Sequence, residues 1–388
     1  MKLLLKPFAF TALLVFSVAI TSLTTLQNKP IKTSSKLNMA PKIQVAILLD
    51  VSNSMDGLID QARAQLWNMA GTLGKAQCNN ITPQIEMALY EYGRSTNNVA
   101  EGYVKQISDF TRDLDQLSKN LFSLTTNGGD EFCGHVIYTS LKELNWDPSP
   151  ENYKVIFIAG NEDFLQGDIL YTKACEEAKK KGVIVNTIYC GEKMQGIKEH
   201  WNLGSECGGG SFTNINQDTK TENIPTPYDS ILFALNGNLN NTYISYGDYG
   251  KAGFSRQAEV DKLNSSMGIT VAANRIAVKG NGKMYRNDNW DLVDAEEKDK
   301  NFIDKLDKKT LPDSLKNKSN EELKQMVAFK SNQRISIQNE ITGLNTKRES
   351  FIAVQRANNA AKNNNATLET EVEKIIKVQA KRYNMIIQ

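Results

Sequence analysis

The sequence predicts a doubly wound α/β fold, in which a mostly parallel sheet carries helices on both faces, followed by a C-terminal helical region. Three observations lead to this prediction. Short runs rich in Ile, Val and Leu alternate with segments of helical apolar spacing up to about residue 245. The first run, residues 43–49, is short and apolar apart from Gln44, as expected of a strand buried on both faces of a parallel sheet. Beyond residue 320 a long helical periodicity takes over.

The expected elements of the sheet region follow one another in a regular alternation. Strands are expected at residues 43–49, 85–92, 103–110, 155–159, 183–189 and 211–215, and helices at 58–73, 114–124, from the turn at 125–131 through 144, at 169–181 and at 228–240. The connection between 85–92 and 103–110 is too short to hold a crossover helix, so these two strands should be antiparallel. One antiparallel edge on an otherwise parallel sheet is common in doubly wound folds.

The C-terminal third has a different pattern. Residues 254–263 have the spacing of a helix within a mixed segment, and from Glu321 onward apolar residues mark one face of a long helix. The pattern breaks at 358–366, and a second helix follows, which suggests an antiparallel hairpin. The expected organisation is a signal peptide at 1–25, a linker at 26–41, an α/β domain at 42–245, a mixed and mostly helical extension at 246–312 and a coiled-coil-like helical hairpin at 313–388.

The net charge and the N-terminal residues limit the kinds of partner and the cellular location that we expect for this protein. A net charge of +2 gives no electrostatic argument for nucleic acid as a partner. Lys2 and Lys6 precede an apolar stretch of about 13 residues, which is shorter than the ~20 that a membrane span needs. This pattern is typical of a secretory signal. We therefore expect an exported protein, periplasmic or extracellular, that touches a membrane only if the N-terminal segment stays uncleaved.

The five cysteines are an odd number, so at least one stays unpaired within a monomer. None forms a Cys-x-x-Cys pair, which argues against a zinc site. In an exported chain Cys190 and Cys207 are the expected disulfide, because both flank the short segment after a predicted strand. The alternative is that all five are small buried residues.

An Asp-x-Ser-x-Ser motif, Asp50, Ser52 and Ser54, comes directly after the first predicted strand. Open α/β sheets bind their ligands at the carboxyl ends of the strands, so the motif lies where a site is expected. One carboxylate and two hydroxyls offer three hard oxygen ligands, which suit Mg²⁺ far better than a soft metal. Their single negative charge leaves the cation partly uncompensated and able to accept an outside ligand.

This motif, with its strand and helix, resembles the metal-ion-dependent adhesion site (MIDAS) of von Willebrand factor type A (VWA) domains. The element order matches over about residues 43–245, and the chain resembles exported bacterial VWA proteins. The resemblance implies protein binding without catalysis: Mg²⁺, or alternatively Mn²⁺ or Ca²⁺, bridges to an acidic residue of a partner protein. The expected role is adhesion or assembly at the cell envelope.

The chain departs from the family at two positions of this site. In the family a Gly-Gly-Thr-like turn supplies a Thr, and an Asp directly follows the central strand. Residues 128–131 here read Gly-Gly-Asp-Glu, and the Asp position falls on Gly160. In the first interpretation Asp130 restores the lost carboxylate, with help from Glu131. The predicted metal ligands are then Asp50, Ser52, Ser54, Asp130 and Glu131.

Two other interpretations of the site and two other functions stay open. Glu162 or Asp163 supplies the missing acid if the loop alignment is shifted, or the site is degenerate and binds no metal. A degenerate site would leave a structural scaffold that binds through its C-terminal helices. A metal-dependent hydrolase is the other alternative. The chain has only two histidines, and His135 is the one candidate acid or base near the site.

Overall fold

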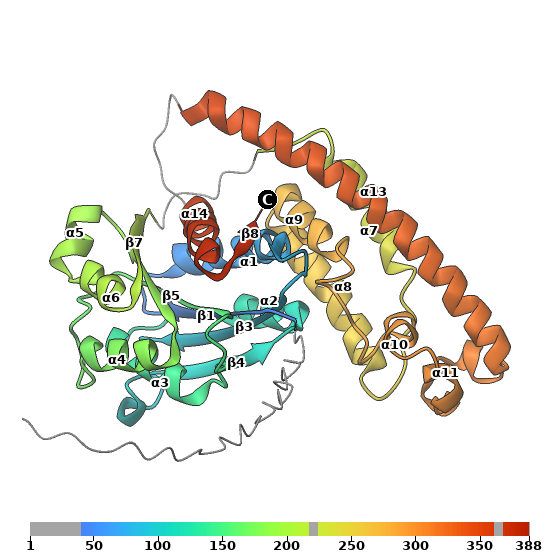
Figure 1. Cartoon of the computed structure of the whole chain (residues 1–388), viewed down its shortest axis with the longest axis horizontal. Helices are drawn as coiled ribbons and strands as arrows, with labels where there is room; N and C mark the ends of the chain where they lie inside the picture. The colour runs from blue at the N-terminus through green and yellow to red at the C-terminus, as the bar shows by residue number, and fades with distance from the viewer. Residues whose placement is uncertain (1–39, 217–223, 361–367, 388) are drawn as a thin grey trace, which may run out of the picture. The chain divides into compact units, whose positions relative to one another are not determined.

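The computed structural model describes residues 40–216, 224–360 and 368–387, so the expected signal peptide lies outside the described residues. The main sheet has the strand order β4-β3-β1-β5-β6-β7 (Figure 1). Its strands are β1 (Lys42–Asp50), β3 (Gln84–Tyr92), β4 (Lys105–Thr111), β5 (Tyr153–Gly160), β6 (Ile184–Cys190) and β7 (Gly209–Ile215). All neighbours pair in parallel except β4, which is antiparallel to β3, as predicted. The doubly wound fold class is therefore confirmed.

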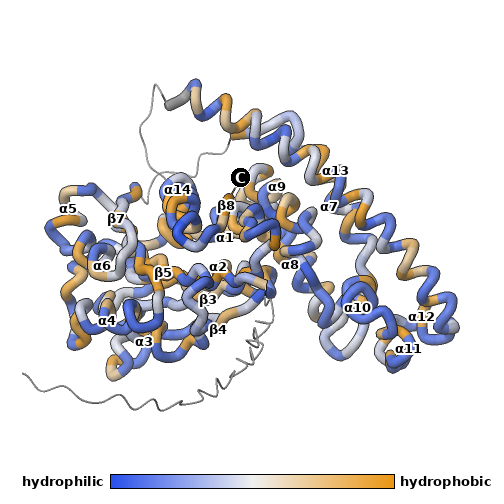
Figure 2. The backbone as a smooth tube through the Cα atoms, in the orientation of Figure 1, coloured by the Kyte–Doolittle hydropathy of each residue, from blue (hydrophilic) through white to orange (hydrophobic). Residues whose placement is uncertain are grey.

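Alternating side chains of β1 build two cores, one on each face of the sheet. Ile43, Val45 and Ile47 belong to the core with α1 (Asp56–Gly74) and α2 (Leu114–Ser123). Ala46 and Leu48 belong to the opposite core, which contains α3 (Cys133–Glu143), α4 (Tyr171–Lys181) and α6 (Trp201–Cys207). Because both faces are covered, β1 is apolar from Val45 to Leu49, and Figure 2 shows mostly hydrophobic residues along β5 as well.

The remaining elements are mostly helical. They are β2 (Ala76–Cys78), α5 (Lys193–Lys198), α7 (Asp229–Asn240), α8 (Gly250–Ser266), α9 (Ile269–Lys279), α10 (Leu292–Lys298), α11 (Phe302–Lys305), α12 (Asp313–Lys316), α13 (Asn320–Ala360), α14 (Leu368–Ala380) and β8 (Met385–Ile387). Six helices, namely α5, α6, α9, α10, α11 and α12, are not among the individual elements predicted from sequence. Of the helices described, none combines the length and apolar character needed to cross a membrane.

The expected antiparallel hairpin of the last two helices is wrong for the described residues, because α14 packs on α1 instead of on α13. Its apolar side chains at Val372, Ile375 and Ile376 are buried in the core on that face of the sheet. Gln379, also buried, accepts from Tyr153 Oη at 3.0 Å. The last strand, β8, then pairs antiparallel with β2. The C-terminus therefore completes the α/β region.

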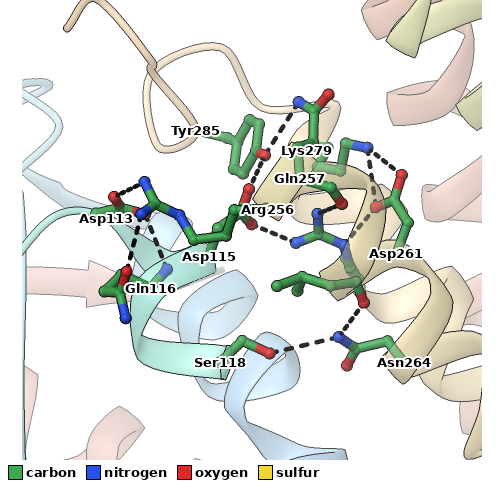
Figure 3. A network of polar contacts seen from close by, with 12 residues as sticks. Asp113, Asp115, Gln116, Ser118, Arg256, Gln257, Asp261, Asn264, Lys279 and Tyr285 are labelled. Atoms are coloured by element: carbon green, nitrogen blue, oxygen red, sulfur yellow. Dashed lines mark hydrogen bonds and ion pairs between the residues drawn. The ribbon is translucent and has the colours of Figure 1, made fainter. Parts of the chain in front are cut away.

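Buried ion pairs join α2 to the C-terminal helices. Arg275 of α9 contacts Asp115 of α2 and Asp261 of α8, each at 2.6 Å, and is only 1% exposed. Tyr285 donates to the other oxygen of Asp115, and Lys279 contacts Asp261 (Figure 3). Removing one member of such a network leaves an uncompensated buried charge, which is strongly destabilising. Residues Ala40–Gln388 accordingly form one compact unit.

The structure corrects the expected disulfide, since Cys207 pairs with Cys175 and not with Cys190. The Cα atoms of the pair are 5.6 Å apart, and the bond joins α4 to the end of α6 on one face of the sheet. The Cys190 side chain points from β6 into the core on the other face. Proximity along the chain therefore misled the prediction, because the alternation of β6 turns Cys190 away from α6.

Candidate metal centre

Loops at the carboxyl ends of three neighbouring strands meet around Asp50, the last residue of β1. Gly93 follows β3, and Asn161 follows β5. A fourth segment, residues 124–132 between α2 and α3, closes over the same place. Because β1, β3 and β5 are parallel, their carboxyl ends share one edge, where α/β sheets bind ligands.

The Asp50 carboxylate is fully buried and incompletely bonded. Its Oδ1 accepts from the backbone N–H of Ser52 at 2.8 Å, whereas its Oδ2 has no partner of normal hydrogen-bond geometry. Burial raises the pKa of Asp50 to about 7, against the lowering effect of hydrogen bonds from Ser52. A buried carboxylate oxygen without a partner is costly, so this atom fits a metal ligand well.

Glu131, and not Asp130, is the acid that lies beside Asp50. The Glu131 side chain is only 8% exposed, whereas Asp130 faces solvent. Burial raises the pKa of Glu131 to about 8, and the charge of Asp50 adds to the effect. The buried acid of this loop is therefore Glu131, which the prediction from sequence placed after Asp130.

Two glycines make room for these acids. Gly93 has φ +80°, and a Cβ there would lie 2.9 Å from both Asp50 Oδ1 and Glu131 Cγ. At Gly160 a Cβ would lie 2.5 Å from Tyr92 Oη and 3.0 Å from Asp50 Oδ2. The position that carries Asp in the VWA resemblance therefore has no space for a side chain here. A carboxylate from the facing loop, Glu131, is the arrangement that this packing permits.

Asn161 is a site residue that sequence reasoning missed. Its amide donates to Ser54 Oγ at 3.2 Å, and its buried Oδ1 has no hydrogen-bond partner. The available signal was its position directly after Gly160 at the end of β5. Asn161 thus brings a second incompletely bonded oxygen to the loop that carries Ser54.

The acidic loop is held in place by contacts to both neighbouring loops. Thr126 Oγ1 donates to Asp56 at the start of α1 at 2.6 Å, and the backbone N–H of Asn127 donates to the carbonyl of Val51 at 2.9 Å. Arg94 donates to the carbonyl of Thr125. These contacts fix the segment from which Glu131 projects.

The other residues considered from sequence lie at the margin of the site. Asp163 Oδ1 lies 3.0 Å from His200 Nδ1 and accepts from the backbone N–H of Leu165. Glu162 is exposed, yet its charge raises the pKa of Asp50 and of Glu131. The His135 ring fills the space beside Gly102 on the β3–β4 connection, and the carboxylates that act on its pKa are Asp168 and Glu101 rather than Asp50 and Glu131.

The donor set suits a hard cation. No group of three or more His, Cys, Asp or Glu side chains able to hold a metal occurs within the described residues. The oxygens that these loops offer are two carboxylates, the hydroxyls of Ser52 and Ser54, and the Asn161 amide. Oxygen donors of this kind are typical of Mg²⁺, Mn²⁺ and Ca²⁺ sites, whereas structural zinc sites use nitrogen and sulfur. The residues therefore fit the cation that the sequence predicts.

Comparisons with known proteins find likenesses of fold over part of the chain. No family model and no curated protein matches the chain. Among solved structures, the SpRpn10 VWA domain is 16% identical with a TM-score of 0.35, covering 46% of this chain and 90% of that one. Proximal thread matrix protein 1 of the mussel byssus, with a zinc-occupied MIDAS motif, is 14% identical with a TM-score of 0.32, covering 46% of this chain and 43% of its own. An aerotolerance-related membrane protein from Bacteroides fragilis is 14% identical with a TM-score of 0.31, covering 45% and 93%. The likeness to VWA domains concerns the fold.

Proposed function

We propose that this chain is an exported, divalent-cation-dependent protein-binding module. Mg²⁺, or Mn²⁺ or Ca²⁺, would be held by Asp50, Ser52, Ser54 and Glu131, with Asn161 at the margin. A carboxylate of a partner protein would fill an open position of the ion. The module would act in adhesion or assembly at the cell envelope.

The observation that carries this proposal is the pair of buried acids without a compensating cation. The strongest charge effects on Asp50 and on Glu131 come from other carboxylates. Two ionised carboxylates buried together repel each other and are poorly solvated, so each resists ionisation. A bound divalent cation removes both penalties, and two acids would balance its charge. Mg²⁺ keeps several waters when it binds proteins, and a partner carboxylate can replace one of them.

Export rests on the N-terminal pattern and on the kinds of protein with similar folds. A pilus adhesin from Lactobacillus rhamnosus is among the similar structures, and the Bacteroides fragilis protein is described as a membrane protein. The Cys175–Cys207 disulfide supports the same assignment, because disulfides persist in oxidising compartments.

Calorimetric titration of Mg²⁺, Mn²⁺ and Ca²⁺ into the full chain tests the metal site. We expect saturable binding that is lost in Asp50→Asn and in Glu131→Gln. Asp130→Asn is the matched control, because it removes an exposed carboxylate from the same loop and should keep binding within a fewfold of the parent. Equal loss in Asp130→Asn would restore the ligand assignment made from sequence, and absence of binding in the parent would refute the proposal.

A further inference from the structure

We propose that exposed apolar side chains around the metal centre form a contact surface for a partner protein whose metal-binding carboxylate is itself set among apolar residues. This inference rests on the proposed function and adds the chemistry of the partner's surface. The apolar collar consists of Val99, Leu165, Leu170, Met194 and Ile197, whose side chains are between 38% and 67% exposed.

We define the collar from the distribution of exposed apolar side chains over the sheet region. Between residues 42 and 215 six large apolar side chains are exposed, and five of them form the collar. Each of the five lies on a loop or short helix that follows the carboxyl end of β3, β5 or β6. The sixth, Ile81, precedes β3 at the opposite edge of the sheet. Single exposed apolar residues are ordinary on proteins, but their concentration at one edge marks an interaction surface.

Packing around Phe132 places two parts of the collar beside Glu131. The Tyr103 ring, at the end of the loop that carries Val99, contacts the Phe132 ring with 5.8 Å between centroids. On the other side, a Cβ at Gly167 would lie 2.6 Å from Phe132 Cγ, so the loop from Leu165 to Leu170 rests on the same ring. Loops bearing collar residues therefore contact both sides of the segment next to the buried acid.

Helix α5 brings the other two collar residues to the site. A Cβ at Gly196 of α5 would lie 2.6 Å from Tyr189 Cγ, so this helix lies directly on the Tyr189 ring. Tyr189 is paired across the sheet with Gly160, whose Cβ position is 3.0 Å from Asp50 Oδ2. Met194 and Ile197 therefore lie on a helix that packs over β6, next to the strand whose Gly160 contacts Asp50.

This arrangement favours an acidic group on an apolar surface. An ion–carboxylate bond is stronger when surrounding groups exclude water, because the local dielectric constant is lower. Apolar contacts around a polar centre supply that exclusion at interfaces. A second copy of this chain fits less well, because a symmetric contact would bring two bound cations toward each other.

The test is selection from a phage-displayed library of random linear peptides on the immobilised full chain in Mg²⁺, with elution by chelator. We expect eluted peptides enriched in Asp or Glu with apolar neighbours. The same selection on the Leu170→Ser, Met194→Ser double variant should keep the acid and lose the apolar enrichment. A selected peptide should bind this variant about fivefold or more weakly by fluorescence anisotropy. Ile81→Ser is the control at the opposite edge and should bind it normally.

The outcomes separate the two proposals. Acidic peptides without apolar neighbours would overturn the collar and leave the metal bridge standing. No chelator-eluted peptides from a chain that binds no metal would overturn both. Dimerisation that depends on Mg²⁺, measured by light scattering and abolished by the double variant, would assign the collar to a second copy and overturn the inference of a different partner. Retained Mg²⁺ binding by the double variant shows that its centre is intact.

Discussion

Replacing the buried carboxylate of Asp50 by an amide should stabilise the metal-free protein and abolish its response to Mg²⁺. The pKa of Asp50 is raised from 3.8 to about 7 by burial. This difference corresponds to about 4 kcal/mol at pH values above 7, because each pKa unit is worth about 1.4 kcal/mol. Asp50→Asn keeps the oxygen that accepts from Ser52 and removes the charge. It also removes one of the charges that raise the pKa of Glu131.

The sign of the pH dependence follows from the raised pKa. Below about pH 4 Asp50 is protonated in the folded and the unfolded chain, so the carboxyl group contributes no pH dependence. Between about pH 4 and pH 7 the unfolded chain loses the proton first, and the metal-free parent loses stability as the pH rises. The advantage of Asp50→Asn should therefore grow across this window to about 4 kcal/mol and then level off.

Urea unfolding at pH 4.5, 6 and 8 in chelator measures this advantage, with Asp130→Asn as the exposed control. Saturating Mg²⁺ should then stabilise the parent, by about 2.7 kcal/mol at a hundred times its dissociation constant, and leave Asp50→Asn unchanged. A constant difference between parent and variant across the three pH values would refute the reasoning. So would a variant less stable than the parent in chelator at pH 8.

Three further predictions concern packing, charge and the disulfide. Gly160→Ala should lower the free energy of unfolding, measured with urea, by about 1–3 kcal/mol, because its Cβ would lie 2.5 Å from Tyr92 Oη. Gly237→Ala is the control: no atom lies within 4 Å of its Cβ, so it should leave the stability unchanged or raise it. Arg275→Met should cost about 3–5 kcal/mol in the same assay, since two carboxylates lose their buried partner. Thiol titration of the denatured, unreduced chain should find three free cysteines, and Cys175→Ser should raise that number by one and lower stability by about 2–4 kcal/mol.

The parallel sheet with one antiparallel edge strand, and the place of the Asp50 motif at the end of β1, were predictable because they depend on local pattern. The apolar run of β1 fixes a strand with two covered faces, and the Asp50 motif must then lie at its carboxyl end. The antiparallel position of β4 followed from a connection too short for a crossover helix. These inferences need no knowledge of distant contacts.

The remaining features depend on contacts between distant segments. Glu131 and Asp130 are adjacent carboxylates, and only the packing of Gly93 against the loop decides which one is buried. To predict that Cys207 pairs with Cys175, one must know on which face of the sheet each helix packs. The position of α14 against the sheet involves contacts such as that between Gln379 and Tyr153, which are 226 residues apart in sequence. The periodicity of apolar residues identifies the buried face of a helix, but it does not identify the element that packs on that face.

The C-terminal helices therefore help to hold the loops of the proposed metal site in position. Helix α2 carries Asp115, which Arg275 and Tyr285 hold from the C-terminal side, and the loop with Glu131 begins where α2 ends. Cutting the chain at residue 245 would leave Asp115 buried without its cation and would remove the helix that covers Tyr153. A fragment ending there would lose metal binding through loss of structure, and its failure would carry no information about the ligands. Metal binding in the full chain is the measurement that separates the chemistry of the site from the stability of the fold.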